Sequence, residues 1–384
     1  MTEWKTYRLG DITIMRNGKK RPNTQGTYPV YGGNGIMDYA DCYNAENTII
    51  VGRVGAYCGN VYQCKSKCWV SDNAISVSAN ELVDDNYLYY LMSSLDFHHH
   101  HIGGAQPLIT QDIIGGFEIS LPSLEEQRRI AGILGAIDDK IENNRRINTN
   151  LELQAQALYK QWFVDFEFPN EEGKPYKSSG GKMVDSELGL IPEGWSVKRL
   201  DDYTVIKRGG SPRPIQNYLS NTGLNWLKIS DATSTNSPFI LEIKEFIKEE
   251  GLSKTVFLKK GNLVLSNSAT PCIPKFLGLD TCIHDGWLYF PNAKLSKEYL
   301  YLLFKNNRQE ILSQGNGSVF LNLKTDILKS HLICLPNCIE KMNCFNMIVK
   351  AIFKNIENCS FEIKRLATLR DTLLPKLMNG EIQL

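Results

Sequence analysis

Basic and hydrogen-bonding side chains recur in turn-rich stretches of both halves of the chain, and their chemistry suits nucleic-acid binding. The first set is Arg16, Asn17, Lys19, Lys20, Arg21, Tyr31, Asn34, Arg53, Tyr57 and Asn73. The second set is Lys207, Arg208, Arg213, Lys228, Asn267, Ser268, Thr270 and Lys275. Arg and Lys can contact phosphates or a guanine edge, Asn an adenine edge, and Tyr can stack or bond to phosphate. Each residue taken alone is more often a solvated charge or a turn former, so the repetition carries the prediction.

Recognisable catalytic motifs are missing from the sequence. It has no G-x-x-x-x-G-K-[ST] loop, no Asn/Asp-Pro-Pro-aromatic motif, no H-E-x-x-H and no G-x-S-x-G. The GGNG at 32–35 lacks dinucleotide spacing and predicts a tight turn. Pro169, Glu172 and Lys174 weakly resemble a metal-dependent nuclease core, but their surroundings favour a linker. We therefore expect a binding module that is not an enzyme and holds no cofactor.

Composition sets the compartment and limits metal binding. The 384 residues are 42% hydrophobic with a net charge of +1, and no apolar run is long enough to span a bilayer, so we expect a cytoplasmic protein. The ten cysteines should be reduced thiols. Neither Cys58, Cys64 and Cys68 nor the group around His331 has the C-x-x-C pairs usual at zinc sites, so no metal is expected. The role of these cysteines and of the histidines at 98–101 is left open.

The chain contains an internal repeat that would place these residues in two similar domains. Trp4 and Gly18 align with Trp195 and Gly209, each 191 residues later. The segment at 103–122 aligns with that at 317–336, 214 residues later. The change of spacing predicts an insertion of about two dozen residues in a surface loop of the second copy.

A long helix is expected after each domain. Ser123 and Glu126 form an S-x-x-E capping pattern at the start of the first, and Asn337 with Glu340 resembles a cap at the start of the second. About 40 residues of helix measure roughly 60 Å. Apolar residues then recur at heptad spacing, which predicts that the two helices pair with each other. The seam residues are Ile130, Leu134, Ile137, Ile141, Leu151, Leu158, Val349, Ile352, Ile356, Ile363, Leu366 and Leu373.

Two asparagines interrupt the first seam. Asn144 and Asn148 could fix the register and orientation of the pair, or could be tolerated where the helices diverge. The sequence favours neither reading.

The expected fold class is α+β, with two mixed α/β domains joined by two long helices in an antiparallel coiled coil with a pseudo-twofold repeat. The expected boundaries are 1–121 for the first domain, 122–166 for the first helix and 167–194 for a linker. The second domain is expected at 195–335 and the second helix at 336–384. Short β-like runs punctuated by Gly, Asn and Pro support this mixture.

Several motifs together resemble the specificity subunit of type I restriction-modification systems. They are LPSLEEQRRIAGILGAIDDKIENNRRIN, QALYKQWFVDFEFPN, GKPYKSSGGKMVDSELGLIPEGW and LLPKLMNGEI. The second helix departs from the pattern at its entry, CLPNCIEKMNCF. The resemblance implies two target recognition domains that each read half of a split, asymmetric site in double-stranded DNA. It also implies two adenine-N6 methyltransferase subunits and two restriction/translocase subunits as partners, which would supply S-adenosylmethionine, ATP and Mg²⁺ chemistry.

Two other functions fit the residues. One is a structural coiled-coil adaptor that binds protein partners, and the other is an enzyme with unrecognised catalytic residues. The DNA sequence read and the gap between its halves are not readable from the chain.

Overall fold

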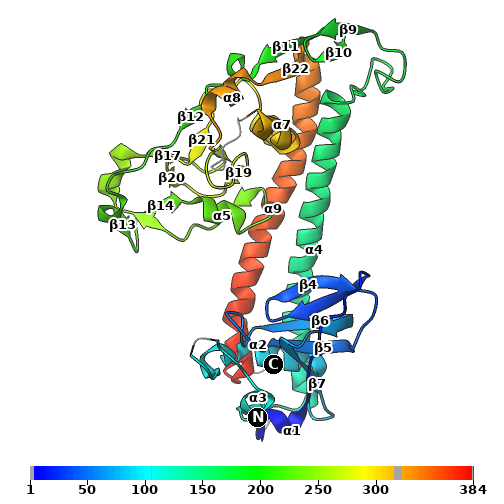
Figure 1. Ribbon diagram of the computed structural model, residues 1–384, viewed down its shortest axis with the longest axis vertical. Coiled ribbons are helices and arrows are strands. Elements are labelled where there is room, and N and C mark those ends of the chain that lie inside the picture. Colours follow the sequence, from blue (N-terminus) through cyan, green and yellow to red (C-terminus); the bar gives the residue numbers. More distant parts are fainter. Residues whose placement is uncertain (1–3, 105, 315–321, 383) are drawn as a thin grey trace. The chain divides into compact units, whose positions relative to one another are not determined.

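Two compact units make up the protein in the computed structural model, which describes residues 4–104, 106–314, 322–382 and 384. The first unit is Met1–Ile141 with Arg365–Leu384, and the second is Glu142–Lys364. Helices α4 (Leu124–Phe163) and α9 (Ile339–Met378) contribute to both (Figure 1). Residues 317–321, which begin the second copy of the aligned segment, lie outside the described residues.

The first unit is built on a six-stranded sheet in the order β2-β7-β5-β6-β3-β4. Its elements are β1 (Lys5–Arg8), α1 (Leu9–Ile12), β2 (Thr13–Asn17), β3 (Tyr28–Gly32), β4 (Gly35–Ala40), β5 (Ala45–Gly52), β6 (Val61–Val70), β7 (Ala74–Ala79), α2 (Asp85–Ser94), α3 (Gln111–Gly115) and β8 (Glu118–Leu121). Strands β1 and β8 form a separate antiparallel pair. Leu9, Ile75, Val77 and Leu88 are fully buried in the core, which Ile130 and Leu134 of α4 join.

The second unit has two five-stranded sheets, β12-β21-β18-β19-β15 and β13-β16-β14-β20-β17. Its elements are β9 (Met183–Ser186), β10 (Gly189–Pro192), β11 (Trp195–Arg199), β12 (Lys207–Arg208), β13 (Leu219–Ser220), β14 (Leu224–Leu227), α5 (Ile229–Thr233), β15 (Phe239–Ile240), β16 (Phe246–Ile247), β17 (Val256–Leu258), β18 (Leu263–Ser266), β19 (Pro274–Leu277), β20 (Thr281–Ile283), β21 (Trp287–Tyr289), α6 (Lys297–Asn306), α7 (Arg308–Ser313), α8 (Thr325–Ser330) and β22 (Leu332–Pro336). Strands β9 and β10 form a hairpin, and β11 pairs with β22.

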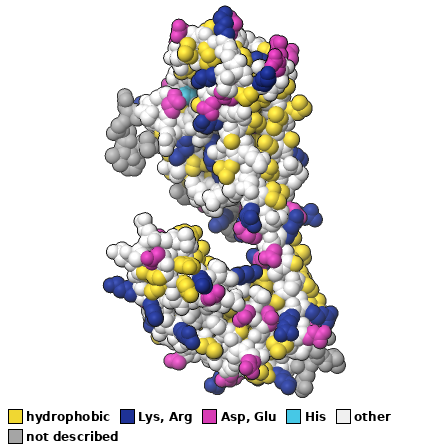
Figure 2. Space-filling view, turned by 90° about the vertical axis from the view of Figure 1, so that its right-hand side faces the viewer, with side chains coloured by type: hydrophobic (Ala, Val, Ile, Leu, Met, Phe, Trp, Pro, Cys, Tyr) yellow, Lys and Arg dark blue, Asp and Glu magenta, His cyan; other side chains and the backbone are white. Residues whose placement is uncertain are grey.

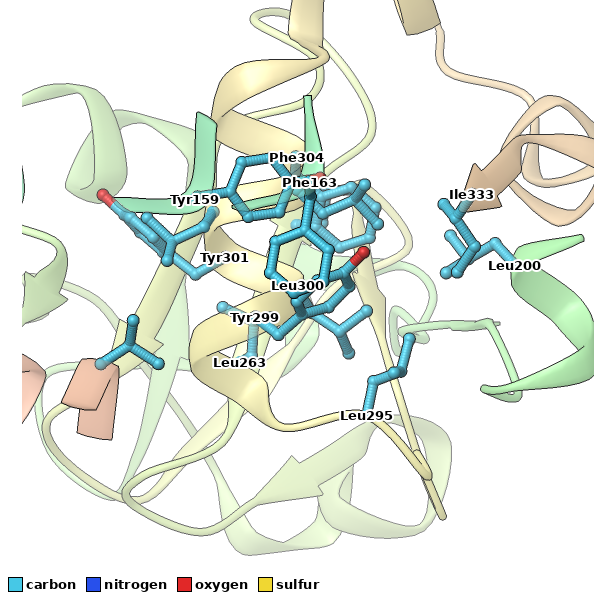
Figure 3. Packing of buried hydrophobic residues seen from close by; sticks show 14 of the residues in the cluster. Tyr159, Phe163, Leu200, Leu263, Leu295, Tyr299, Leu300, Tyr301, Phe304 and Ile333 are labelled. Atoms are coloured by element: carbon cyan, nitrogen blue, oxygen red, sulfur yellow. The ribbon is translucent and has the colours of Figure 1, made fainter. Parts of the chain in front are cut away.

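Aromatic side chains fill the core of the second unit. Tyr299 of α6 packs edge-on against Phe163 of α4 at 5.0 Å between ring centroids, and Tyr159 lies 5.6 Å from Tyr299. Figure 3 shows these rings together with Tyr301 and Phe304. The end of α4 is therefore part of the domain core as well as of the helix pair.

The internal repeat is confirmed by strand order and register. The order β2-β7-β5-β6 of the first unit recurs as β12-β21-β18-β19 in the second. Asn17 pairs with Ile75, which also pairs with Val51. Their counterparts Arg208, Leu288 and Leu265 pair in the same way.

Helices α4 and α9 pair antiparallel, as predicted. In the first unit Ile130 and Leu134 near the start of α4 share a core with Leu377 near the end of α9. In the second unit Tyr159 near the end of α4 shares a core with Phe345 near the start of α9. All twelve seam residues are buried or half-buried. No helix among the described residues is long and apolar enough to cross a membrane.

The two seam asparagines bond across the helix pair. Asn144 is 1% exposed, and its Nδ2 donates to Glu362 Oε2 at 2.8 Å. Asn148 Nδ2 donates to Ser360 Oγ at 3.1 Å. These bonds favour the reading in which the asparagines fix the register, because each needs one particular partner opposite it.

The serine half of the predicted first cap is present, whereas the Glu126 carboxylate accepts from the Leu384 N–H and from Arg129, and the second cap is not formed. The backbone N–H of Glu126 donates to Ser123 Oγ at 3.3 Å, and α4 begins at Leu124. Helix α9 begins at Ile339, which puts Asn337 outside the cap position. Asn337 Oδ1 instead accepts from Ser196 Oγ, so this side chain ties β11 to the helix entry.

Candidate nucleic-acid interface

Three loops of the first unit are joined by backbone hydrogen bonds at one edge of the sheet. They are the segment after β2, the turn before β7 and the loop after β5. The bonds run from Gly18 N to Ala74 O (3.0 Å), Lys19 N to Val70 O (3.0 Å), Arg53 N to Asn73 O (2.8 Å) and Ile109 N to Arg53 O (2.9 Å). Residues far apart in sequence are thereby held close together.

The second unit repeats this set of bonds at equivalent positions. They run from Gly209 N to Trp287 O (2.9 Å), Gly210 N to Ile283 O (3.1 Å), Asn267 N to Gly286 O (2.8 Å) and Leu323 N to Asn267 O (2.8 Å). Arg53 and Asn267 are therefore structural counterparts. We call the three bonded loops of each unit its loop frame: residues 17–20, 52–60 and 71–74 in the first, and 208–211, 266–273 and 284–287 in the second.

Glycine is required where the first loop of each frame crosses the turn. A Cβ on Gly18 would lie 1.9 Å from the Ser71 carbonyl oxygen, and one on Gly209 would lie 2.2 Å from that of His284. Both distances are well inside van der Waals contact, so a side chain would push the loops apart. The sequence alignment of Gly18 with Gly209 reflects this shared close approach.

The longest loop of each frame has the same backbone shape. Gly55 and Gly59 have φ of 79° and 87° in the first unit. The corresponding Ala269 and Cys272 have φ of 59° and 60°. Left-handed backbone costs a non-glycine residue about 1–2 kcal/mol, so the second unit retains this loop shape despite its strain.

Most of the predicted residues of the first unit lie exposed on or beside this frame. Arg16, Asn17, Lys19, Lys20, Arg21, Asn34, Tyr57 and Asn73 are exposed. Arg21 is paired with Asp38. Arg53 is half-buried, and its Nε has no hydrogen-bond partner among the described residues. The turn that carries Asn34 joins the group, because a Cβ on Gly33 would lie 3.3 Å from the Val54 carbonyl oxygen.

In the second unit, Asp285 connects the predicted basic residues. Its carboxylate accepts from Ser211 Oγ at 2.7 Å and Arg213 Nη2 at 3.1 Å, and its carbonyl oxygen accepts from Arg208 Nε at 3.2 Å. The hydrogen bond from Ser211 is the main cause that lowers the pKa of Asp285, with the charges of His284 and Arg213 adding to it. Lys207, Arg208 and Arg213 are exposed.

The remaining predicted residues of the second unit differ in exposure. Lys228, Ser268 and Thr270 are half-buried. Asn267 is 1% exposed, and its Nδ2 donates to the Asp285 carbonyl oxygen at 3.3 Å. Asn267 therefore supports the frame and presents no side chain to a ligand, contrary to its prediction from sequence.

Lys275 and Tyr31 also lie outside the candidate interface, contrary to prediction. Lys275 Nζ is buried and donates to the carbonyl oxygens of Thr235 (2.7 Å) and Ser237 (2.5 Å). Burial, with repulsion from Lys305, lowers the pKa of Lys275 to about 8. Tyr31 is 8% exposed and packs in a small core with Ile50, so its ring cannot stack on a base.

Sequence reasoning missed Ser211, His284 and Asp285. Asp285 is acidic, and Ser211 and His284 are not strongly basic, so looking for basic side chains does not find them. The available signal was their position, because His284 and Asp285 directly follow β20 and precede Gly286.

Charge and thiol chemistry add no further site. Basic and acidic side chains are interspersed on the face seen in Figure 2, consistent with the net charge of +1. All ten cysteines are free thiols. Within the part of the chain that the structure describes, no group of three or more His, Cys, Asp or Glu side chains is arranged to hold a metal ion.

Comparison with known proteins identifies the family. Residues 1–153 match the family model described as "Type I restriction modification DNA specificity domain". The chain is 30% identical over 315 residues to the type I restriction enzyme MjaIX specificity subunit of Methanocaldococcus jannaschii, covering 78% of this chain and 70% of that one. The chain belongs to the family of type I restriction enzyme specificity subunits. As a member of this family it is a non-catalytic, DNA-binding subunit.

Other specificity subunits agree in sequence and in fold. The HindI specificity subunit of Haemophilus influenzae is 27% identical over 335 residues, covering 73% of this chain and 72% of that one. The crystal structure of the type I restriction-modification S subunit from M. genitalium superposes with a TM-score of 0.65 at 15% identity, covering 98% and 96% of the two chains. That likeness shows a shared fold for the specificity subunits.

Proposed function

We propose that this specificity subunit reads a bipartite, asymmetric site in double-stranded DNA, with one half-site for each recognition domain. The observation that supports it is the loop frame, which recurs with the same backbone bonds but carries different side chains in the two units. Side chains recognise the edges of bases. Two domains with the same loop backbone and different side chains could therefore bind duplex DNA in the same way and select different bases.

The proposed DNA contacts are the predicted residues that lie on or beside the frames with side chains at least partly exposed. In the first domain they are Arg16, Asn17, Lys19, Lys20, Arg21, Asn34, Arg53, Tyr57 and Asn73. In the second domain they are Lys207, Arg208, Arg213, Lys228, Ser268 and Thr270. The near-neutral net charge supports weak binding by the isolated chain, because phosphate contacts dominate affinity.

The two long helices are proposed to set the gap between the half-sites. We assign residues 1–121 and 195–335 to the recognition domains, 122–166 and 336–384 to the spacer helices, and 167–194 to the connection between them. Each helix has 40 residues, about 60 Å at 1.5 Å per residue, which exceeds the roughly 34 Å between half-sites one DNA turn apart.

Catalysis is proposed to come from partner subunits that dock on this chain. These would be two adenine-N6 methyltransferase subunits that use S-adenosylmethionine and two restriction/translocase subunits that use ATP and Mg²⁺. The chain itself would need no cofactor. Exposed apolar residues on the helices, such as Leu153 and Met347 at 57% and 68% exposure, support a docking role.

Exchanging recognition domains tests this proposal. Residues 1–121 are replaced by the first domain of another family member, and the methylated sequence of the host genome is read by long-read sequencing. We expect one half-site to change while the other half-site and the gap stay the same. The matched exchange of residues 195–335 should change only the other half-site. Retention of the original complete site in both exchanges would refute the recognition role.

A further inference from the structure

A cavity of about 820 Å³ opens beside Asp285 in the second unit. Apolar side chains of Pro212, Ile215, Trp226 and Ile229 form much of its wall. Arg213, Lys228 and His284 also line it. This volume lies within the range of about 300–1,000 Å³ typical of small-ligand sites, which combine apolar walls with a few convergent polar groups.

The stretch of chain that supplies most of the cavity lining is longer in the second unit than in the first. Gly18 and Arg53 are 35 residues apart, whereas their counterparts Gly209 and Asn267 are 58 apart. The insertion thus lies between Gly209 and Asn267, as do all the lining residues except His284. Part of the lining has a counterpart in the repeat, because Trp226 pairs in parallel with Cys282 as Val30 pairs with Trp69, so Trp226 stands where the first unit has Val30.

Two planar rings lie side by side at one wall of the cavity, His284 partly exposed and Trp226 only 2% exposed. Trp226 and His284 lie 5.8 Å apart between centroids with a tilt of 48°. His284 Nδ1 accepts from the Gly286 N–H at 2.8 Å, so the proton of the neutral ring is on Nε2. Burial lowers the pKa of His284, which favours this neutral form near pH 7. The wall thus offers the partly exposed imidazole of His284, backed by the buried ring of Trp226.

Two cations line the same cavity and are positioned by carboxylates. Arg213 Nη2 bonds to Asp285, and its side chain is 79% exposed. Lys228 Nζ lies 2.5 Å from Glu245 Oε1. A guanidinium has five N–H donors and an ammonium three, so one carboxylate contact leaves donors for an anion. Each cation is therefore held in place by a carboxylate and keeps N–H donors that can bind a phosphate.

We propose that this cavity is a nucleotide-binding site, with the base against Ile215, Ile229 and the His284 imidazole and the phosphate at Arg213 and Lys228. The nucleotide could be an extrahelical one from bound DNA or a free one. Continuity with the loop frame through Asp285 favours the DNA source, and that source rests on the proposed function. Taking a base out of the stack costs stacking free energy, which contacts in the cavity would offset.

The first experiment tests the site without DNA. Deoxynucleoside 5′-monophosphates are titrated into the full chain and followed by calorimetry. We expect saturable binding, at least tenfold weaker for the nucleosides without phosphate. R213Q and the cavity-filling variant S230W should each weaken binding at least tenfold. The control R199Q removes an arginine of the same unit that is also paired with an aspartate, and should bind normally.

The second experiment tests the DNA source. Duplexes that carry 2-aminopurine at successive adenine positions of both half-sites are bound to the subunit with its methyltransferase partners. A fluorescence rise confined to one step of the second domain's half-site, and lost in S230W, would establish an extrahelical nucleotide. Mononucleotide binding without that rise would establish a site for free nucleotides. Absence of both signals overturns the proposal.

Failure of this proposal is distinguishable from failure of the recognition role. Binding of mononucleotides by the chain alone does not depend on half-site reading. Domain exchanges that leave the methylated site unchanged would refute the recognition role, whatever the titrations give.

Discussion

The buried ammonium of Lys275 links the stability of the second unit to pH. Its two bonds to carbonyl oxygens keep it in place, but burial disfavours its charged form and lowers its pKa from 10.5 to about 8. Between these values the unfolded chain binds more protons than the folded one at this residue, so stability rises with pH. Below pH 8 both states carry the proton and the penalty is fully present.

We therefore expect a pH-dependent difference between the wild-type chain and K275M. The free energy of unfolding of the wild-type chain, minus that of K275M, should rise by about 3 kcal/mol in total from pH 8 to 10.5. Urea unfolding at several pH values measures it. K244M removes an exposed lysine of the same unit and should show no such rise. A flat difference for K275M would contradict the assignment.

Single residues also show which features of the interface the sequence could not predict. Charged and polar types predicted the exposed members of the interface, such as Lys19 and Arg208, because such residues favour water unless paired. The same reasoning failed for Lys275 and Asn267, because their burial depends on strands and turns that the sequence does not position. Asp285, which joins three basic or polar side chains, carries the opposite charge to the one sought.

The antiparallel pair of α4 and α9 is the element that the sequence predicted best. Heptad spacing reports burial against a partner helix directly. It was less informative near the start of α9, where Phe353 is more buried than the expected Ile352. Phe353 packs against Phe276 of β19 at 5.2 Å and Tyr301 of α6 at 5.1 Å. A sheet and a third helix cover this position. Heptad spacing predicts contacts with a partner helix only, so it does not predict this burial.

The hydrogen bond from Asn144 to Glu362 should contribute measurably to the stability of the α4 and α9 helix pair. N144A removes a buried donor and should destabilise the chain by about 1–3 kcal/mol. N143A, at the exposed neighbouring position, gains the same helix propensity and should stay within about 0.5 kcal/mol. Equal effects in urea unfolding would show that the bond adds nothing.

For the whole molecule, the internal repeat was predictable and the meeting of the loops was not. Aligned residues such as Gly18 and Gly209 gave the repeat from spacing alone. The frame forms because β7 lies between β2 and β5 in the sheet. Strand order of this kind depends on long-range pairing, so the sequence showed candidate residues without showing which of them meet.

Shortening both helices tests their role as a spacer. Asn144 bonds to Glu362 and Asn148 to Ser360, so the heptad 144–150 faces approximately 357–363. Deleting both heptads removes about 10 Å of helix, equal to about three base pairs. We expect methylome sequencing to find the same half-sites with a gap shorter by that amount. An unchanged gap would show that the length of the helices does not set the distance between the half-sites.

The loop frames have a consequence for how target preference could evolve. Main-chain bonds and close-packed glycines hold each frame, so its exposed or half-buried side chains, such as those of Tyr57 and Thr270, contribute little to its shape. Substitutions at these positions should be nearly neutral for folding, as surface changes usually are. A lineage could therefore acquire new target sequences by point mutation without passing through unstable intermediates.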